Sequence, residues 1–153
     1  MDQTLFTVLF LFTTAWVGPF WMLMLIAPDH ERTHKWMEPP WFFVGPLVVW
    51  FIVILSDPKG LMDLMSNSSN DGMLDSLVTL LGTPEGTLSA WAHMVAGDIL
   101  VTRWIWKRTL EYNTDLWVAR LCIFLGVMLM PLGLALSIFL VKEKNQSTLG
   151  TGV

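Results

Sequence analysis

The sequence predicts an all-α membrane protein: a four-helix transmembrane bundle, with amphipathic helices at the membrane interface between its second and third spans. Of the 153 residues, 54% are hydrophobic and only 14% are charged, and the mean hydropathy is +0.55. An average soluble domain is much less apolar. Each bilayer crossing takes about 20 residues. The chain therefore has room for one transmembrane domain over residues 1–153, with about four spans and no separate soluble domain.

The first predicted span covers about residues 4–27, and the pair Gly18-Pro19 should kink it near its middle. Residues 29–40 are the most charged stretch, and we expect them to form a short connection at the interface. The second span covers about residues 41–55. Because the chain begins Met-Asp-Gln, without the basic segment of a signal peptide, we expect the first span to be retained.

Residues 57–82 contain no apolar run long enough to cross a bilayer. The segment begins with Asp57-Pro58, which is typical of a helix start. Its last part carries an apolar stripe at helical spacing, formed by Met73, Leu74, Leu77, Val78 and Leu81. We therefore expect surface helices that lie on the membrane.

Two more spans follow. Thr83-Pro84 also has the form of a helix start, and the third span covers about residues 86–106. The fourth covers about residues 115–141, and residues 142–153 form a polar tail. Four crossings place both termini on one side of the membrane. The positive-inside rule makes this the outer or lumenal side, by a margin of one charge.

Charge and cysteine content exclude several kinds of site. A net charge of −4 gives no basic surface for a phosphate backbone, so nucleic acid is excluded as a partner. One cysteine, Cys122, excludes a disulfide framework or a thiolate metal cage within the chain. His30 and His34 are four residues apart in the charged connection, but this composition is also that of a solvated loop. We expect no metal site.

The third span places three ionisable side chains, His93, Asp98 and Arg103, inside a lipid-spanning helix. Even lenient scales give about 2.5–3.5 kcal/mol for one charge at the bilayer centre, so such residues are candidates for function. Spacings of five residues rotate by about 140°, so the three do not share one stripe. Asp98 can touch Thr102 one turn later. Arg120 of the fourth span lies on the same membrane side as Arg103, so the Asp98 carboxylate can lie between two guanidinium groups from adjacent helices.

Two interpretations of this cluster stay open: it fastens the third and fourth helices together, or it contacts a ligand or a proton. For His93 the alternatives are a general acid or base, an axial ligand of chlorophyll magnesium, and a donor to a backbone carbonyl. Trp50 and Trp91 lie deep in their spans. With neighbouring aromatic residues they could line a slot for a flat conjugated ligand, or they could simply pack.

These residues resemble a known family, the neoxanthin-synthase-type (abscisic-acid-deficient type) membrane proteins of plants, cyanobacteria and other bacteria. The resemblance covers roughly residues 13–140, and the third-span pattern is its specific part. It rests on Pro19-Phe20, Ala27-Pro28, Thr33, Lys35, Met37, Glu38 and the pattern Ala90-Trp91-x-His93-x4-Asp98-x4-Arg103.

The resemblance implies a multi-pass protein of bacterial or thylakoid-type membranes that is associated with the conversion of violaxanthin, a carotenoid diepoxide, to the allene neoxanthin. This isomerisation needs a base, an acid and no redox cofactor. Asp98 is then expected to be the base, and His93 or a water bound by arginine the acid. Arg103 or Arg120 would stabilise the developing alkoxide.

Three classes of function remain: a carotenoid isomerase, a non-catalytic carotenoid- or chlorophyll-binding accessory subunit of a photosynthetic membrane, and a small structural subunit. The expected catalytic residues are Asp98, His93 and Arg103. The expected substrate-binding residues are Arg120, Trp91, Thr102 and Trp50. The expected partners are a carotenoid or another polyene lipid, membrane lipids and other membrane subunits, with chlorophyll as a further candidate ligand and no other cofactor.

Overall fold

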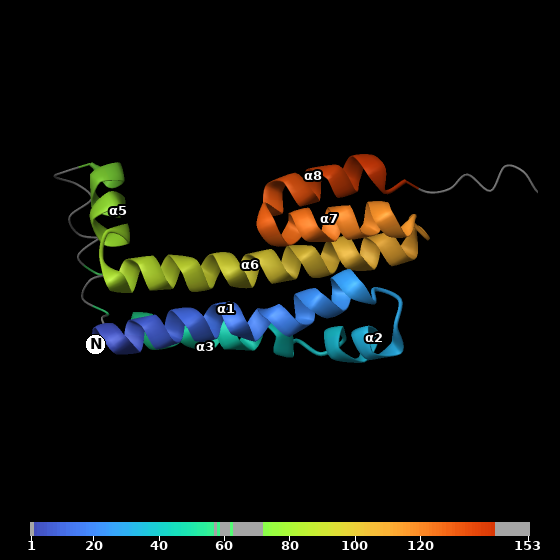
Figure 1. Ribbon diagram of the computed structural model, residues 1–153. Coiled ribbons are helices and arrows are strands. Elements are labelled where there is room, and N and C mark those ends of the chain that lie inside the picture. The colour runs from blue at the N-terminus through green and yellow to red at the C-terminus, as the bar shows by residue number, and fades with distance from the viewer. Residues whose placement is uncertain (1, 57, 59–61, 63–71, 143–153) are drawn as a thin grey trace, which may run out of the picture.

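A computed structural model describes residues 2–56, 58, 62 and 72–142, and every regular element in this part of the chain is a helix. The expectation of an all-α protein is therefore confirmed. Figure 1 shows the elements in order, α1 (Gln3–Ile26), α2 (Glu31–Met37), α3 (Trp41–Ser56), α5 (Met73–Leu81), α6 (Pro84–Glu111), α7 (Leu116–Met128) and α8 (Met130–Leu140).

Helix α6 is the axis of the molecule, because α1, α3, α7 and α8 all pack against it. At 28 residues it is about 42 Å long. α1 runs parallel to it: the indole N–H of Trp91 donates to the Thr14 hydroxyl at 3.1 Å, and that of Trp106 donates to the Pro28 carbonyl at 2.8 Å. α3 runs in the opposite direction, so that Phe42 at its start lies near Arg103, late in α6.

Residues 29–40 are not merely a connection at the interface, as the sequence analysis expected. They contain α2, which packs against α1 and leads through Pro39-Pro40 into α3. Thr33 and Met37 on this short helix are both 0% exposed. This buried face was hard to predict from the sequence, because the segment is highly charged. Only one polar and one apolar residue, a single helical turn apart, form the face.

Helix α5 stands crosswise to α6 at the end where α6 begins, and it extends to the side away from α1 and α3 (Figure 1). Its Leu74 and Val78 are 72% and 62% exposed. This helix fits the expected amphipathic surface helices at the end of 57–82. The expected helix start at Asp57 lies outside the described residues.

The segment 115–141 is not the single helix that the sequence analysis expected. It forms α7 and α8, which fold back on each other as a hairpin (Figure 1). Leu129 between them has φ −144° and ψ 75°, outside the helical region. Pro131 follows at the start of α8, where its missing N–H is tolerated and the residue before it is biased away from helix. At about 20 Å and 17 Å, neither helix spans a bilayer core of about 30 Å.

Two glycines allow the hairpin to close against α6. A Cβ atom on Gly133 would overlap the backbone of Gly126, so the two helices touch at this point. A Cβ atom on Gly126 would in turn lie 2.9 Å from Ile105 and 3.1 Å from the Thr102 hydroxyl. The Met-Pro-Leu-Gly sequence inside the expected fourth span is therefore the turn and first contact of the hairpin.

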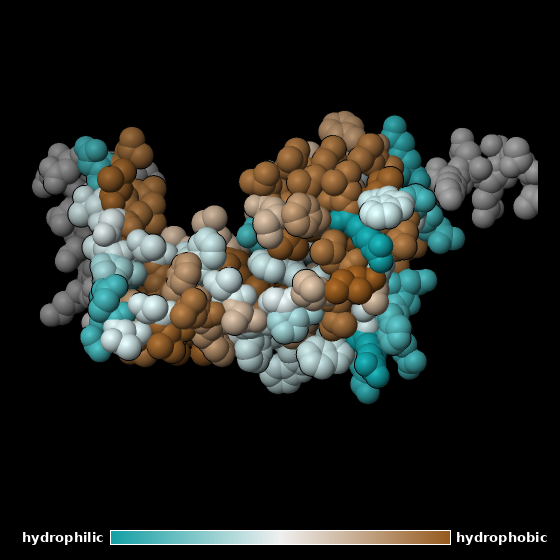
Figure 2. All heavy atoms as spheres, viewed as in Figure 1, coloured by the Kyte–Doolittle hydropathy of each residue, from teal (hydrophilic) through white to brown (hydrophobic). Residues whose placement is uncertain are grey.

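Many of the side chains exposed on the surface of the molecule are apolar. Two helical segments, Gln3–Ile26 and Glu31–Ser56, are long and apolar enough to cross a membrane, and α7 and α8 are shorter apolar helices. Figure 2 shows large hydrophobic areas on the α7–α8 hairpin, with hydrophilic residues gathered toward the two ends of the molecule. Trp117 and Phe139 on the hairpin are 76% and 69% exposed. These properties fit association with a membrane.

Replacement of Gly133 tests the hairpin contact. Gly133→Ala is expected to lower the free energy of unfolding by about 1–3 kcal/mol, because the methyl group must push α8 away from α7. The matched control is Gly18→Ala, where nothing lies within 4 Å of the added Cβ atom. Thermal unfolding in mild detergent measures both variants. Equal melting temperatures for the two would contradict the close contact.

Candidate functional site

Arg103 and Arg120 hold the ends of other helices and do not form an ion pair with Asp98. Arg103 donates from Nε to the Met37 carbonyl at 2.7 Å, at the end of α2. Arg120 donates from Nε to the Leu25 carbonyl at 3.1 Å and from a terminal nitrogen to the Ile26 carbonyl at 2.9 Å. The last carbonyls of a helix have no partner within it, so these guanidinium groups satisfy them.

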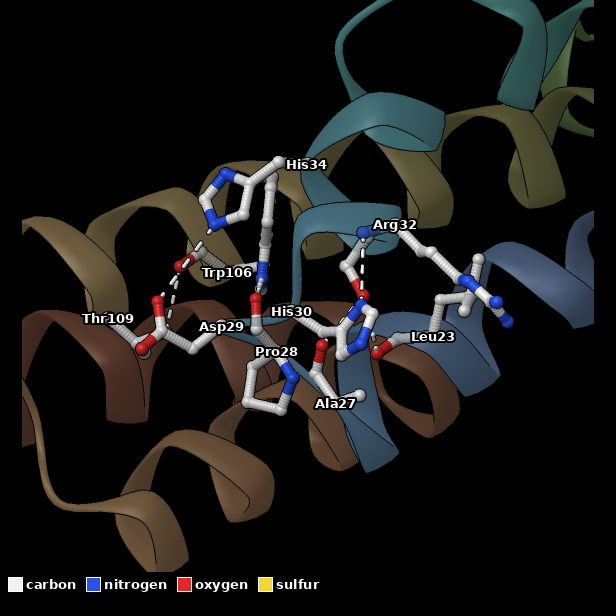
Figure 3. Close-up of polar contacts among 10 residues, drawn as sticks. Leu23, Ala27, Pro28, Asp29, His30, Arg32, His34, Trp106 and Thr109 are labelled. Carbon is white, nitrogen blue, oxygen red and sulfur yellow. Dashed lines mark hydrogen bonds and ion pairs between the residues drawn. The ribbon is translucent and has the colours of Figure 1, made fainter.

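The same pattern recurs at other helix ends. Arg108 donates to the Val141 carbonyl at 3.2 Å, just after α8. Figure 3 shows the turn after α1, where Trp106 of α6 donates to Pro28. The Thr33 hydroxyl of α2 contacts the Ala27 carbonyl at 2.6 Å. Side chains of α2, α6 and α7 therefore supply the donors that the helix ends lack.

Asp98 lies apart from the other expected catalytic residues. Among the residues that the structure describes, the one ion pair is between His34 and Asp29 at 3.9 Å, and Asp98 takes part in none. The rotation of about 140° between His93 and Asp98 directs them to different sides of α6. One turn beyond Asp98, Thr102 is 0% exposed beneath Gly126. The expected convergence of Asp98 with either arginine is therefore wrong.

His30 and His34 face different partners (Figure 3). The Nδ1 atom of His30 accepts from the Arg32 N–H at 3.0 Å and caps α2, while the His34 ring lies 5.2 Å from that of Trp106. No group of three or more His, Cys, Asp or Glu residues suited to a metal occurs in the described part of the chain.

A pocket of about 380 Å³ lies between α3, α5 and the first half of α6. α3 contributes Trp50 and α6 contributes His93, so two of the expected site residues meet there. Leu80 and Leu81 of α5 close the pocket at the end of the bundle. Asp98, Arg103, Arg120, Trp91 and Thr102 are not among the residues that line it.

Three of the α6 residues that line this pocket have polar side chains, Glu85, Ser89 and His93. They are four residues apart, so they lie one above another along one face of the helix. We call them the polar ladder. Together they offer a carboxylate, a hydroxyl and an imidazole to a site whose other walls are mostly apolar. An apolar pocket with a few converging polar groups is the usual form of a small-molecule site.

Threonines at the start of α6 hold the end of α5 in place beside the pocket. The Thr83 hydroxyl donates to the Leu80 carbonyl at 2.7 Å and accepts from the Gly86 N–H at 3.0 Å, and Thr87 donates to Leu81 at 2.6 Å. A Cβ atom on Gly86 would overlap the Leu80 carbonyl oxygen, so only glycine allows α5 to approach this closely.

Trp91 ties α6 to α1. Its ring stacks on that of Phe10 with centroids 5.0 Å apart, and its N–H is bonded to Thr14. The sequence analysis singled out Trp91 as a ligand contact, whereas the structure places it between helices and outside the pocket.

Glu85 and Ser89 are the site residues that the sequence analysis missed. Glu85 was hidden in the Thr-Pro-Glu helix start, where an acidic residue is expected for helix stability alone. The spacing Glu85-x3-Ser89-x3-His93 is the signal that would have joined both residues to His93.

Comparison with known proteins gives one family and a relative. The family model described as ABA DEFICIENT 4-like matches residues 8–136. Protein ABA DEFICIENT 4, chloroplastic, of Arabidopsis thaliana is 29% identical over 124 residues, which are 80% of this chain and 54% of that protein. The chain thus spans about half the length of this curated relative. No solved structure matches the chain significantly.

The role of Arg120 as a helix-end donor is testable. Arg120→Ala should lower the free energy of unfolding by about 1–3 kcal/mol, because two helix-end carbonyls lose their donors. Arg120→Lys should recover only part of this loss, since lysine lacks the planar fork. Thermal unfolding in detergent is the measurement, and Lys107→Ala at an exposed position of α6 is the control. If Arg120→Ala melted like the control, the helix-end role would be refuted.

Proposed function

The chain belongs to the ABA DEFICIENT 4-like family, and on that premise we propose that it is a multi-pass membrane protein of carotenoid metabolism that isomerises a xanthophyll epoxide to an allene by acid and base catalysis. The polar ladder in the apolar pocket is the observation that carries this proposal. An oxygen-bearing ring at the end of a long hydrocarbon matches a site in which a few polar residues interrupt mostly apolar walls.

The pocket also has a favourable position for such a ligand. It lies at the end of the bundle beside α5, the helix that stands crosswise to α6 (Figure 1). If α5 rests on the membrane surface, the polar ladder is at the interface, where the oxygen atoms of a xanthophyll ring also prefer to be. The polyene then extends into the hydrocarbon region.

The proposed reaction moves one proton onto the substrate and one off it. A carboxylate removes the proton from the polyene carbon next to the ring, and the freed electron pair becomes the second double bond of the allene. The ring carbon attached to this polyene carbon loses its bond to the epoxide oxygen. The oxygen then takes a proton and becomes a hydroxyl group. No atom is gained or lost overall, and no electron acceptor is needed.

His93, one of the two acids expected from the sequence, is the acid in this proposal, because an imidazole can act as a general acid. The base is Glu85 in place of Asp98, since Glu85 is the carboxylate that shares the pocket with His93. Ser89 between them can hydrogen-bond to the ring oxygen. Arg103 and Arg120 have no proposed part in the chemistry, because both are bonded to backbone carbonyls.

Expression in a host that makes violaxanthin tests the function. The wild-type chain should produce an allenic xanthophyll, while Glu85→Gln and His93→Gln should each lower its formation by about 10²–10⁴-fold. Asp98→Asn is the matched comparison, since it also neutralises one carboxylate of α6. Activity retained in Asp98→Asn and lost in Glu85→Gln supports Glu85 as the base, and the reverse result restores Asp98.

Expression in a host that makes only β-carotene gives the necessary contrast, because that hydrocarbon has no epoxide to open. Co-purification of a carotenoid or chlorophyll without any conversion would favour the accessory-subunit alternative, in which His93 beside the pocket binds a pigment. Failure to bind or convert any pigment in either host would refute both proposals.

We further propose three crossings, by α1, by α2 with α3, and by α6, with the α7–α8 hairpin entering and leaving on one side. This replaces the expected four spans because the hairpin turns back at Leu129. The bond from Arg108, late in α6, to Val141 places the end of α8 at the opposite end of the bundle from Gln3, which lies near Pro84.

Cysteine labelling tests this topology. Asp2→Cys and Lys142→Cys should react with an impermeant reagent from opposite sides of sealed vesicles. The wild-type chain is the control, since its single cysteine, Cys122, is 0% exposed. Labelling of both new cysteines from the same side would favour four spans.

A further inference from the structure

Helix α6 is covered unevenly along its length. The α7–α8 hairpin packs over its second half, where Gly126 meets Thr102 and Ile105. Figure 2 shows a hollow over α6 between α5 and the hairpin. The hairpin does not reach α5, so among the residues that the structure describes, one side of the first half of α6 has no neighbour there.

This uncovered strip continues the pocket. Ala90 and Met94 line the pocket, and Gly97 follows on the same side of α6, since seven residues complete about two turns from Ala90. No atom of the described residues lies within 4 Å of a Cβ atom built on Gly97, so the space beside it is open in this part of the structure. We call the strip from Ala90 to Gly97 the α6 groove. One turn further along, Val101 is partly buried and packs against the core, and Thr102 beside it lies against Gly126 of the hairpin, so the groove ends there.

The pocket and the α6 groove together are shorter than the proposed ligand. From Gly86 in the pocket to Val101 at the hairpin, α6 rises by about 22 Å. A xanthophyll is about 30 Å long, comparable to the hydrocarbon thickness of a bilayer. A molecule with one ring in the pocket therefore meets the hairpin before its second ring can enter the protein.

We propose that the protein recognises a carotenoid by one end only, with the reacting ring in the pocket, the adjoining polyene in the α6 groove, and the far ring in the lipid. The inference rests on the proposed function. It assigns Gly97 as a specificity-determining residue, since any side chain there fills the space that the polyene needs. It also makes the chemistry of the far ring irrelevant to binding.

A pair of substrates tests the far-ring part of the inference. Violaxanthin has an epoxide on both rings, and the corresponding monoepoxide has one such ring and a different far ring. With one-ended recognition, purified protein in nanodiscs should bind and convert the monoepoxide about half as well as the diepoxide, because the diepoxide has two equivalent ends. A difference of more than about tenfold would overturn the inference.

Gly97→Leu tests the groove. The variant should retain the melting temperature of the wild-type protein, because the side chain points into open space. It should lower pigment binding and conversion at least tenfold. Gly18→Leu is the matched control, since it also adds leucine to a long helix beside open space, and it should leave both unchanged. Unchanged binding in Gly97→Leu would overturn the inference.

The binding readout separates the two proposals. If pigment binding is lowered by Gly97→Leu and does not depend on the far ring, but no allene forms, the isomerase proposal fails and one-ended recognition stands. If allene forms but its yield depends strongly on the far ring, or does not change in Gly97→Leu, the isomerase proposal stands and one-ended recognition fails. If no carotenoid binds, both fail.

Discussion

The structure depends on side chains that donate to carbonyls at helix ends, because the last carbonyls of a helix have no partner within it. The ends of α1, α2 and α8 receive donors from Arg120, Arg103 and Arg108. Threonine hydroxyls at the start of α6 serve the end of α5. The donors belong mainly to α6 and its neighbour α7, so α6 both positions the other helices and carries the polar residues of the pocket. Its unusual polarity therefore has two separate causes.

The sequence analysis could predict the helices that the apolar pattern and the proline positions define. Its first, second and third spans differ from α1, α3 and α6 by at most five residues at an end. It could not predict the hairpin, because a Pro-Gly interruption in an apolar run is compatible with a kinked crossing as well as with a reversal. The choice between them depends on whether Gly133 meets Gly126, which is a contact between helices and is absent from any local pattern.

The candidate site was predicted in part for a related reason. His93 and Trp50 do meet in one pocket, but Arg103 and Arg120 were given chemical roles on the argument that a charge inside a span is functional. A partly buried arginine can also be satisfied by backbone carbonyls, as both arginines are here. A carbonyl at a helix end does not appear in a list of side chains, so the arginines were paired with Asp98, the carboxylate that lies well inside a predicted span. Glu85 was not considered as a site residue, because its position in the first turn of a helix already accounts for an acidic side chain.

The backward turn of α7 and α8 also has a consequence for biosynthesis. A segment that crosses a bilayer must carry the polar residues on its far side through the hydrocarbon, whereas a hairpin that returns to its starting side need not. Asp115 and Lys142 flank the apolar hairpin at one end of the bundle. In the proposed three-crossing topology, the hairpin therefore enters the membrane after α6 is in place, without translocation of either charge. Membrane insertion and docking against α6 would then be a single step, completed when the two glycines meet.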